Sequence, residues 1–350
     1  MSIKVFINSR QANRTKKTGK GVYARAVIDY LKTKKDLDVI ELKDNFWSKI
    51  GLWHIATALK LKLDKNAIYF DPESFITPFF VSLMTKHKVV VTIHDMVAFN
   101  FPKGHFLKPL LVERLFLPLL VKMSKIKFFC VSHFTKSQFS KYFNLDESRV
   151  TVTPLGFEYN GGHNKSKSAI VDTSPKIVCV STFLERKNQL SLVYEFSLVK
   201  DEIPHNLYLI GGGDTSYVNK VQNLIYELKL QDRVFITGFI SRDHKNRLIQ
   251  EAEFSIYPSL YEGFGIPLLE SVSQNTPVIT TKNTVMQEVC EDAALYFDPK
   301  KTTDLAFQIK YLAGNKELQQ IMLDKSVRIL DKYSWKNTAA KVYNEFKKLA

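Results

Sequence analysis

The segment Ser259–Glu270 contains the residues whose types and spacing are best suited to chemistry. Two carboxylates, Glu262 and Glu270, stand on either side of Gly263-Phe264-Gly265, and a proline two residues further on is typical of the first turn of a helix. Backbone N–H groups at a helix start attract anions, and glycines let a phosphate approach because they carry no Cβ. The segment therefore predicts an anion site flanked by two carboxylates.

A carboxylate beside an anion site suits a ligand that also has neutral hydroxyl groups, as the ribose and hexose of a nucleotide-sugar do. Glu270 would stand about one turn into the helix, where its side chain leans back toward the anion site. A structural interpretation is also open, in which Glu270 complements the helix dipole and Glu262 is an exposed turn residue.

Four further segments combine glycines or polar residues with a position just after a predicted strand. Arg186 and Lys187 are candidates to stabilise the charge that grows on a departing diphosphate, the first as a fork of donors and the second as a point charge. Gly19 and Gly21 would present backbone N–H groups from a loop before a helix. The four segments are Gly19-Lys20-Gly21, His94-Asp95, Glu185-Arg186-Lys187-Asn188 and Gly211-Gly212-Gly213.

The elements that must position these residues alternate between strand-like and helix-like patterns. Strands are expected at 3–8, 39–42, 68–70, 89–93 and 127–131, and again at 177–181, 206–210, 234–237, 254–257 and 277–280, with a first helix at 22–31. Such alternation predicts parallel sheets with crossover helices. Ligands of these sheets bind beyond the carboxyl ends of the strands, which is where the motifs stand.

The chain has 350 residues, more than one hydrophobic core usually organises, so two domains are expected. A polar, glycine-containing stretch at 160–168 interrupts the alternation and predicts a linker. The predicted fold class is α/β, with two doubly wound Rossmann-like domains facing a cleft. We expect an acceptor-binding domain at 1–165, a nucleotide-sugar-binding domain at 176–334 and a final helix at 335–350.

The positive charge is confined to one half of the chain. Residues 1–170 contain 28 Lys and Arg against 13 Asp and Glu, whereas residues 171–350 contain 22 of each. This asymmetry favours an anionic partner for the first half, such as a membrane surface, nucleic acid or a phosphorylated acceptor. The basic, apolar stretches 46–63 and 108–127 could lie on a membrane surface or pack as ordinary core helices.

Cysteine and carboxylate spacing argue against a metal centre. The three cysteines are far apart, which fits a reducing cytosol, and no signal peptide is recognisable at the start of the sequence. The Asp-x-Asp spacing at Asp36-Leu37-Asp38 precedes a strand and is interpreted as surface. Gly211-Gly212-Gly213 lacks the Gly-x-Gly-x-x-Gly pattern, which disfavours a dehydrogenase. We therefore expect no metal and no cofactor besides the donor substrate.

The pair of glutamates around Gly-Phe-Gly-x-Pro resembles the signature of family 4 glycosyltransferases, and the four further segments occur in that family's order. The resemblance runs from residue 3 to about residue 348. It implies the GT-B fold, retaining and metal-independent transfer, and a final helix that crosses back onto the first domain. His94 in its Val-Thr-Ile-His-Asp setting resembles the mannosyl- and rhamnosyltransferase-like branch.

The resemblance also implies roles for individual residues. Gly263, Phe264 and Gly265 would face the diphosphate, and Glu270 would bind the ribose. Many relatives carry an arginine five residues before the lysine that corresponds to Lys187. This chain has Thr182 at that position, so Arg186 is expected to supply the charge. The remaining assignments are a donor-sugar and phosphate contact for His94, an orienting or acceptor-binding role for Asp95, and a sugar contact for Glu262. Gly211 would contribute to the donor site, with base contacts near Gly238 and Phe239.

The sequence thus predicts a hexosyltransferase that moves sugar from a nucleoside-diphosphate donor to a glycan or lipid-linked glycan during cell-surface polysaccharide synthesis. GDP-mannose and UDP- or dTDP-sugars all remain candidate donors. The expected location is the cytoplasm or the inner membrane face. Alternatives are a nucleotide-sugar epimerase or phosphorylase of the same fold, a basic nucleic-acid-binding protein, or a non-catalytic scaffold. Aromatic residues do not interleave with the basic ones as in RNA-binding motifs, so no nucleic-acid partner is expected.

Overall fold

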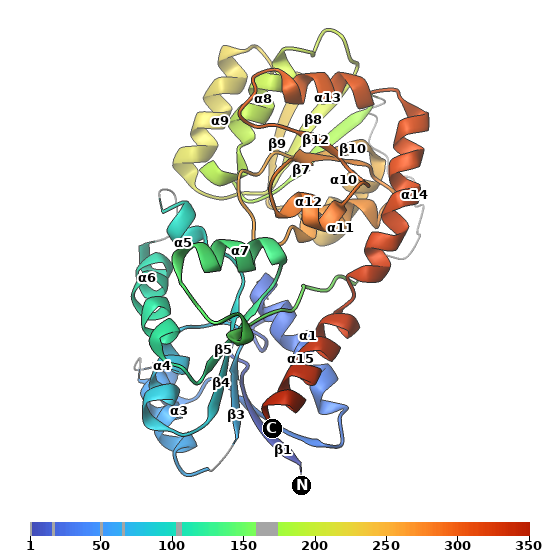
Figure 1. Cartoon of the computed structure of the whole chain (residues 1–350). Helices are drawn as coiled ribbons and strands as arrows, with labels where there is room; N and C mark the ends of the chain where they lie inside the picture. Colours follow the sequence, from blue (N-terminus) through green and yellow to red (C-terminus); the bar gives the residue numbers. More distant parts are fainter. Residues whose placement is uncertain (1, 16–17, 50–51, 65–66, 103–106, 159–173) are drawn as a thin grey trace. The chain divides into compact units, whose positions relative to one another are not determined.

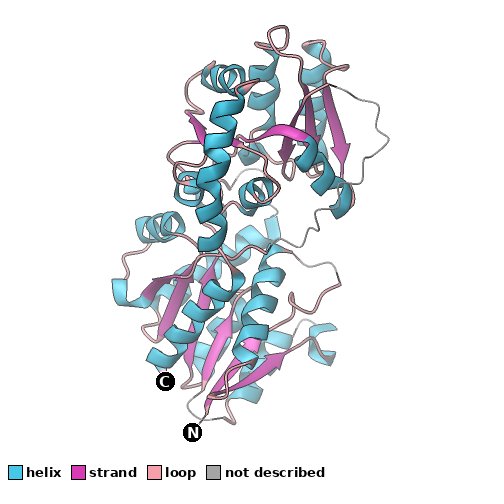
Figure 2. Ribbon diagram, turned by 90° about the vertical axis from the view of Figure 1, so that its right-hand side faces the viewer, coloured by secondary structure: helices cyan, strands magenta, loops and turns pink. Residues whose placement is uncertain are grey.

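The computed structural model describes residues 2–15, 18–49, 52–64, 67–102, 107–158 and 174–350. Two compact units divide the chain. Unit 1 contains residues 1–156 together with 333–350, and unit 2 contains residues 157–332. The predicted linker at 160–168 falls outside the described residues. Figure 1 labels the elements, and Figure 2 shows that helices cover both faces of each sheet.

Unit 1 is built on a six-stranded parallel sheet in the order β2-β1-β3-β4-β5-β6. Its third and fourth strands are buried on both faces and read as almost continuous apolar runs, as parallel strands do. The strands are β1 (Ile3–Asn8), β2 (Leu37–Leu42), β3 (Ile68–Asp71), β4 (Lys88–Ile93), β5 (Ile126–Cys130) and β6 (Val150–Val152).

The helices of unit 1 form two layers. Right-handed crossovers place the helix between β1 and β2 on one face and the helices between β2 and β6 on the other, because the chain reverses direction across the sheet after β2. Figure 1 shows this separation. The helices are α1 (Gly19–Lys32), α2 (Phe46–Lys49), α3 (Trp53–Leu61), α4 (Ile76–Met84), α5 (Val97–Asn100), α6 (Leu107–Lys122), α7 (His133–Tyr142) and α15 (Trp335–Leu349), with a 3₁₀ turn at Glu147–Arg149.

The final helix belongs to unit 1, where α15 packs against α1. The Phe346 ring meets the Phe70 ring edge-on with 5.4 Å between centroids, and the Tyr343 hydroxyl donates to Asp36 over 2.7 Å. The buried Glu345 carboxylate forms an ion pair with Lys127 of β5. The last sixteen residues therefore complete the core that the first 156 begin.

Unit 2 repeats the architecture with the strand order β12-β11-β10-β7-β8-β9, again parallel throughout. Its strands are β7 (Lys176–Val180), β8 (Asn206–Ile210), β9 (Val234–Gly238), β10 (Ala252–Tyr257), β11 (Val278–Thr281) and β12 (Leu295–Phe297). Its helices are α8 (Gln189–Ser197), α9 (Thr215–Glu227), α10 (Arg242–Glu251), α11 (Ile266–Val272), α12 (Val285–Cys290), α13 (Asp304–Leu312) and α14 (Lys316–Lys332), with a 3₁₀ turn at Glu185–Lys187.

The predicted fold class of two parallel α/β sheets is confirmed, with differences in detail. The strands β6 and β12 were not expected. The prediction that Gly19 and Gly21 form a loop before the first helix is wrong. Helix α1 begins at Gly19, and the Thr18 side chain accepts the Gly21 N–H. None of the described helices is long and apolar enough to span a bilayer.

Candidate functional site

The two predicted cations of unit 2 bind one of the predicted carboxylates. Arg186 Nη1 lies 3.1 Å from Glu262 Oε2, and the Lys187 ammonium forms an ion pair with Glu262 Oε1. Ser259 Oγ donates to Glu262 Oε1 over 3.0 Å. All three charged side chains are largely buried, with 10% of the Lys187 side chain exposed. Glu262 is therefore held by the cationic pair and is not an isolated turn residue.

The local backbone explains why these side chains meet. After β7, the Glu185–Lys187 turn ends at Asn188, whose φ of 60° reverses the chain before α8. The turn is fastened to the segment after β10, because the Leu260 N–H donates to the Arg186 carbonyl over 2.8 Å. Arg186 Nη1 also donates to the Tyr261 carbonyl over 3.1 Å. Two loops that follow neighbouring strands are thereby joined at the carboxyl edge of the sheet.

The glycine turn before α11 has the geometry that its sequence implies. Gly265 has a φ of 106°, a backbone conformation that favours glycine, and a Cβ there would lie 2.9 Å from the Met286 sulfur. Phe264 is buried, and Pro267 occupies the first turn of the helix. The turn is therefore a rigid start for α11.

Glu270 of α11 is paired with a cation that the sequence analysis did not identify. Its carboxylate lies 2.7 Å from Lys245 Nζ of α10, and about a fifth of each side chain is exposed. Lys245 stands in the first turn of a helix that Ser241 caps. The sequence contained a signal for Lys245, because it follows the capping residue Ser241 by about one turn. A side chain at that position leans back toward the start of its helix.

Predicted site residues that follow three strands, β7, β8 and β9, line one pocket of about 280 Å³ in unit 2. Lys187 and Lys245 are its cationic residues, and Phe239 contributes an aromatic ring that is 82% exposed. The complete lining is Val180, Ser181, Thr182, Lys187, Ile210, Gly211, Gly238, Phe239, Ile240, Lys245 and Pro267. The pocket thus combines positive charge, exposed backbone and an aromatic surface, which suits a nucleotide.

Close backbone packing shapes this pocket. A Cβ on Gly211, whose φ is 137°, would lie 2.2 Å from the Ser181 carbonyl oxygen. A Cβ on Gly212 would lie 2.6 Å from the Phe239 ring. The Gly211 N–H donates to the Gly238 carbonyl over 3.1 Å, which ties the ends of β8 and β9 together. The first two glycines of the triplet therefore serve packing at the edge of the pocket.

His94 and Asp95 follow β4 in unit 1, as predicted. His94 Nε2 donates to the Pro72 carbonyl over 2.8 Å, so Nδ1 is the acceptor of a neutral ring. Burial, supported by the charge of Lys20, lowers the pKa of His94 to about 4. The Tyr23 ring packs edge-on against it, with 5.2 Å between centroids. Asp95 accepts the Val97 N–H over 2.9 Å and thereby organises the start of α5.

Two glutamates that were not predicted as site residues are largely buried in unit 1. Glu113 of α6 is 9% exposed, and one of its oxygens, Oε1, has no hydrogen-bond partner among the described residues. Burial, and then the charge of Asp95, raises the pKa of Glu113 to about 8. Glu73 accepts the backbone N–H groups of Gln11 and Ala12, and burial raises its pKa to about 8 as well.

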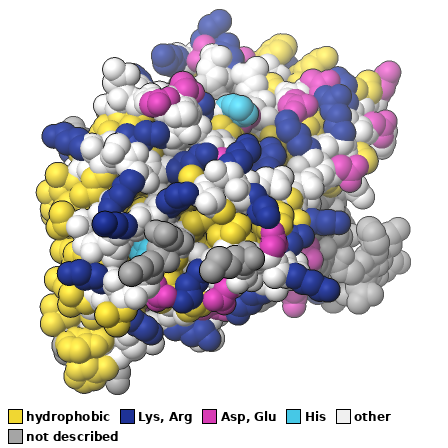
Figure 3. Space-filling model, turned by 60° about the horizontal axis from the view of Figure 1, so that its bottom comes forward, with side chains coloured by type: hydrophobic (Ala, Val, Ile, Leu, Met, Phe, Trp, Pro, Cys, Tyr) yellow, Lys and Arg dark blue, Asp and Glu magenta, His cyan; other side chains and the backbone are white. Residues whose placement is uncertain are grey.

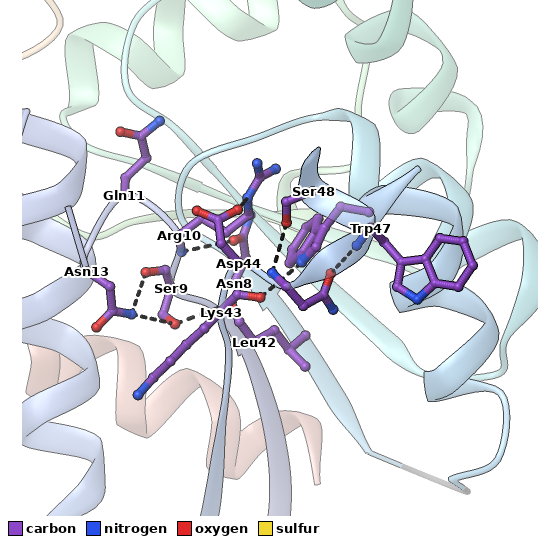
Figure 4. A network of polar contacts seen from close by, with 12 residues as sticks. Asn8, Ser9, Arg10, Gln11, Asn13, Leu42, Lys43, Asp44, Trp47 and Ser48 are labelled. Atoms are coloured by element: carbon purple, nitrogen blue, oxygen red, sulfur yellow. Dashed lines mark hydrogen bonds and ion pairs between the residues drawn. The ribbon is translucent and has the colours of Figure 1, made fainter. Parts of the chain in front are cut away.

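A second polar network lies at the ends of β1 and β2 (Figure 4). Arg10 Nε binds Asp44 Oδ1 over 2.6 Å, and its guanidinium stacks 4.5 Å from the centroid of the buried Trp53 ring. The buried Asp71 carboxylate accepts hydrogen bonds from Asn8 and the Tyr69 hydroxyl. Arg10, Asp44, Asn45 and Ser48 line an open pocket of about 410 Å³.

The structure therefore brings together part of the predicted site in each unit. In unit 2 it joins Arg186 and Lys187 to Glu262, and it places Lys187 in one pocket with Gly211, Gly238 and Phe239. In unit 1, His94 and Asp95 share the carboxyl edge of the sheet with the start of α1. No group of three or more His, Cys, Asp or Glu side chains within the described ranges is arranged to hold a metal ion.

Comparison with known proteins gives a family for this arrangement. Residues 162–326 match the model of "Glycosyl transferases group 1". The chain is 28% identical over 215 residues to the O-antigen chain mannosyltransferase RfbU of Salmonella typhimurium, covering 60% of this chain and 56% of that protein. It is 24% identical over 300 residues to the O-antigen chain mannosyltransferase B of Escherichia coli, covering 81% and 75%. The match thus spans little more than half of the first relative's length.

Solved structures share the fold over nearly the whole chain. A crystal structure of Anabaena Alr3699/HepE in complex with UDP and glucose superposes with a TM-score of 0.74 at 14% identity, covering 99% of this chain and 100% of that one. Sucrose-phosphate synthase from Thermosynechococcus elongatus gives a TM-score of 0.77 at 14% identity, with coverage of 100% and 99%. Residues 162–326 thus match the group 1 glycosyltransferase family, and the two parallel sheets have the GT-B fold of the solved structures.

Proposed function

We propose that the protein is a retaining hexosyltransferase that transfers sugar from a nucleoside-diphosphate donor to a glycan or lipid-linked glycan during cell-surface polysaccharide synthesis. The observation that carries this proposal is the unit 2 pocket, where Lys187 stands beside the Phe239 ring and next to the carboxylate of Glu262. The names of the two O-antigen mannosyltransferases favour mannose as the transferred sugar.

Each part of a nucleotide-sugar has a matching group in unit 2. The exposed Phe239 ring offers a stacking surface for a base. Lys187 and Arg186 would bind the diphosphate, and Glu270 would accept hydrogen bonds from the ribose hydroxyls. Glu262 forms ion pairs with both Arg186 and Lys187, and one of its oxygens would accept a hydrogen bond from a hydroxyl of the donor sugar.

The chemistry expected of these residues is electrostatic. The bond between the sugar and the diphosphate breaks as negative charge moves onto the leaving phosphate, and two preorganised cations in a largely buried setting stabilise that charge. The leaving phosphate would accept the proton of the acceptor hydroxyl on the same face of the sugar. This route retains the donor's anomeric configuration and requires no nucleophile from the protein.

We propose that unit 1 holds the acceptor. The open pocket of Arg10, Asp44, Asn45 and Ser48 offers both donors and acceptors of hydrogen bonds, as a chain of sugar hydroxyls requires. Neutral His94 adds a hydrogen-bond acceptor at Nδ1 rather than a positive charge. His94 is therefore better suited to a hydroxyl group than to a phosphate.

The test begins with a thermal-shift screen of UDP-, GDP- and ADP-sugars and of GDP-mannose in particular. A donor present at one hundred times its dissociation constant stabilises the folded protein by about 2.7 kcal/mol. The donor that binds is then incubated with glycan acceptors, with and without EDTA, and the product is examined by NMR. We expect a product with the donor's anomeric configuration and activity that survives EDTA.

Three results would contradict the proposal. An inverted product would exclude the same-face route, and an absolute requirement for a divalent ion would show that Arg186 and Lys187 do not suffice. Conversion of the donor alone into a free epimer would identify the epimerase alternative instead.

A further inference from the structure

Helix α6 in unit 1 exposes bulky apolar side chains along one side, while Leu117 and Leu120 are buried on the other. Leu107 is 75% exposed, Leu111 57% and Leu115 60%, and Leu119 continues the same series at spacings of four residues. The inward side of the helix carries the buried carboxyl group of Glu113. Residues four apart lie on one face of a helix, so the leucines form a continuous exposed stripe along about 18 Å of helix.

The stripe continues onto the neighbouring helices. Helix α4 packs against both α3 and α6, and the Phe79 and Phe116 rings meet edge-on with 5.5 Å between centroids. These helices form one layer on the sheet, so their outward side chains share a surface. We call this surface the leucine face; its further exposed members are Ile55, Leu59, Leu63 and Leu83. Figure 3 shows hydrophobic side chains gathered along that side of the molecule.

Exposed lysines stand at one end of the leucine face. Crossover helices run antiparallel to the strands, so α3, α4 and α6 all end at the amino edge of the sheet. Lysines occur at or just after each of these ends, and the exposed ones among the described residues include Lys60, Lys62, Lys86, Lys122 and Lys125. The topology therefore collects positive charge beside a large apolar surface.

We propose that the leucine face docks on an anionic lipid bilayer, with α6 lying in the plane of the interface. A helix with a bulky apolar side and flanking lysines enters the boundary between headgroups and acyl chains, and each nearby lysine adds about 1 kcal/mol of attraction to an anionic surface. Charge selects this occupant over a second copy of the chain, because residues 1–170 carry 15 more positive than negative charges and two such units repel each other.

This inference does not depend on the sugar, the base or the catalytic residues. It concerns a surface formed by α3, α4 and α6, whereas the proposed donor pocket belongs to unit 2. Its failure and the failure of the proposed function are therefore distinguishable. It adds to the proposed function, because a lipid-linked acceptor would lie in the same bilayer on which the protein docks.

The full chain is tested by co-sedimentation with vesicles of phosphatidylcholine alone and of phosphatidylcholine mixed with phosphatidylglycerol, at low and high salt. We expect binding to the anionic vesicles and weakening by salt, because surface charges are screened over about 8–10 Å near physiological ionic strength. The double variant Leu111→Ser, Leu115→Ser should bind at least tenfold more weakly. The control Phe307→Ser, Val327→Ser removes side chains of similar exposure, 62% and 61%, from unit 2 and should bind within twofold of wild type.

A second pair of variants tests the lysines. Neutralising Lys60 and Lys62 with glutamine should weaken binding to anionic vesicles on the order of tenfold at low salt. The matched control neutralises the exposed Lys300 and Lys301 of unit 2, with little effect. Unchanged melting temperatures confirm that the variants fold.

Several outcomes would overturn the proposal. Equal binding to neutral and anionic vesicles removes the role of charge, and binding to neither removes the bilayer as occupant. A dimer in size-exclusion chromatography that the leucine variant dissociates would identify a second copy of the chain as the occupant. Equal loss of binding in the leucine variant and its unit 2 control would place the surface elsewhere.

Discussion

Lys245 and Glu270 join α10 to α11 through an ion pair with 2.7 Å between the ammonium nitrogen and the carboxylate. Lys245 also lines the pocket that contains Lys187 and Phe239. The pair is partly exposed, and such pairs contribute only about 0–1 kcal/mol. The ion pair thus positions Glu270 but holds it weakly. Ribose hydroxyls can therefore replace the contact between Glu270 and Lys245 at little cost in free energy.

The first prediction concerns the sugar part of the nucleotide. Glu270→Gln should weaken binding of the nucleoside diphosphate on the order of tenfold while lowering turnover less, because ribose contacts form before the reaction and persist through it. The variant should also lose the preference for ribose over the 2′- or 3′-deoxy nucleotide. Isothermal calorimetry with the ribose, 2′-deoxy and 3′-deoxy nucleotides measures binding, and steady-state rates measure turnover.

Glu227→Gln, an exposed change on α9, is the control. If Glu270→Gln still discriminates between ribose and both deoxyribose forms as well as wild type does, Glu270 does not bind the ribose.

The second prediction concerns the contribution of Lys187 to the rate of sugar transfer. Lys187→Ala should lower the rate constant for transfer on the order of 10²–10³-fold, the cost typical of losing one preorganised donor to a developing negative charge. Donor binding should fall less, because Arg186 stays in place. Steady-state rates and single-turnover measurements give the two quantities. Lys220→Ala, which removes an exposed lysine of unit 2, serves as the comparison.

Glu262 supplies the third prediction. Its carboxylate neutralises one of the two charges carried by Arg186 and Lys187, so it competes with an incoming diphosphate. Glu262→Gln should therefore bind the free nucleoside diphosphate as tightly as wild type or more tightly, while turnover falls because the sugar contact is lost. Calorimetry beside steady-state kinetics shows whether the two quantities move apart.

Weaker nucleotide binding in Glu262→Gln, accompanied by normal turnover, would mean that this carboxylate only maintains the loop. Near wild-type turnover in both Lys187→Ala and Glu262→Gln would remove the assignment of the catalytic site altogether.

The sequence predicted the elements more fully than the contacts between them. Apolar runs and alternating polarity identified ten of the strands, because parallel strands are buried along their length. The two missed strands, β6 and β12, have three residues each, too few to show a period. The start of α1 was placed too late because glycines are typical of loops, whereas here the Thr18 cap fixes the helix start before both of them.

The site could be predicted as a set of residue types but not as a set of partners. Glu262 and Arg186 are 76 positions apart, and only the pairing of β10 with β7 brings their loops together. Lys245 was overlooked because a charged residue in a polar helix usually faces solvent. Glu113 was overlooked because charged residues of such a helix usually face solvent, as Arg114 and Lys122 do, whereas Glu113 is buried.

The burial of the Glu113 carboxyl group leads to the last prediction. Burial raises the pKa of Glu113 from 4.5 to about 8, so the folded state favours the protonated carboxyl group. The stability that protonation provides is fully present below pH 4.5 and is lost as the pH rises through 8, because the unfolded chain then releases a proton that the folded chain retains. Glu113→Gln mimics the protonated group and should remove this dependence.

We therefore expect the melting temperature of Glu113→Gln relative to wild type to rise by about 4 °C or more between pH 5 and pH 9, since 1 kcal/mol corresponds to roughly 2–4 °C in units of this size. Differential scanning fluorimetry across this range measures it, with the exposed Glu147→Gln of the same unit as control. A constant difference between Glu113→Gln and wild type from pH 5 to pH 9 would show that Glu113 ionises normally. In that case Lys20, which opposes the shift, would outweigh the burial of the carboxylate and its repulsion by Asp95.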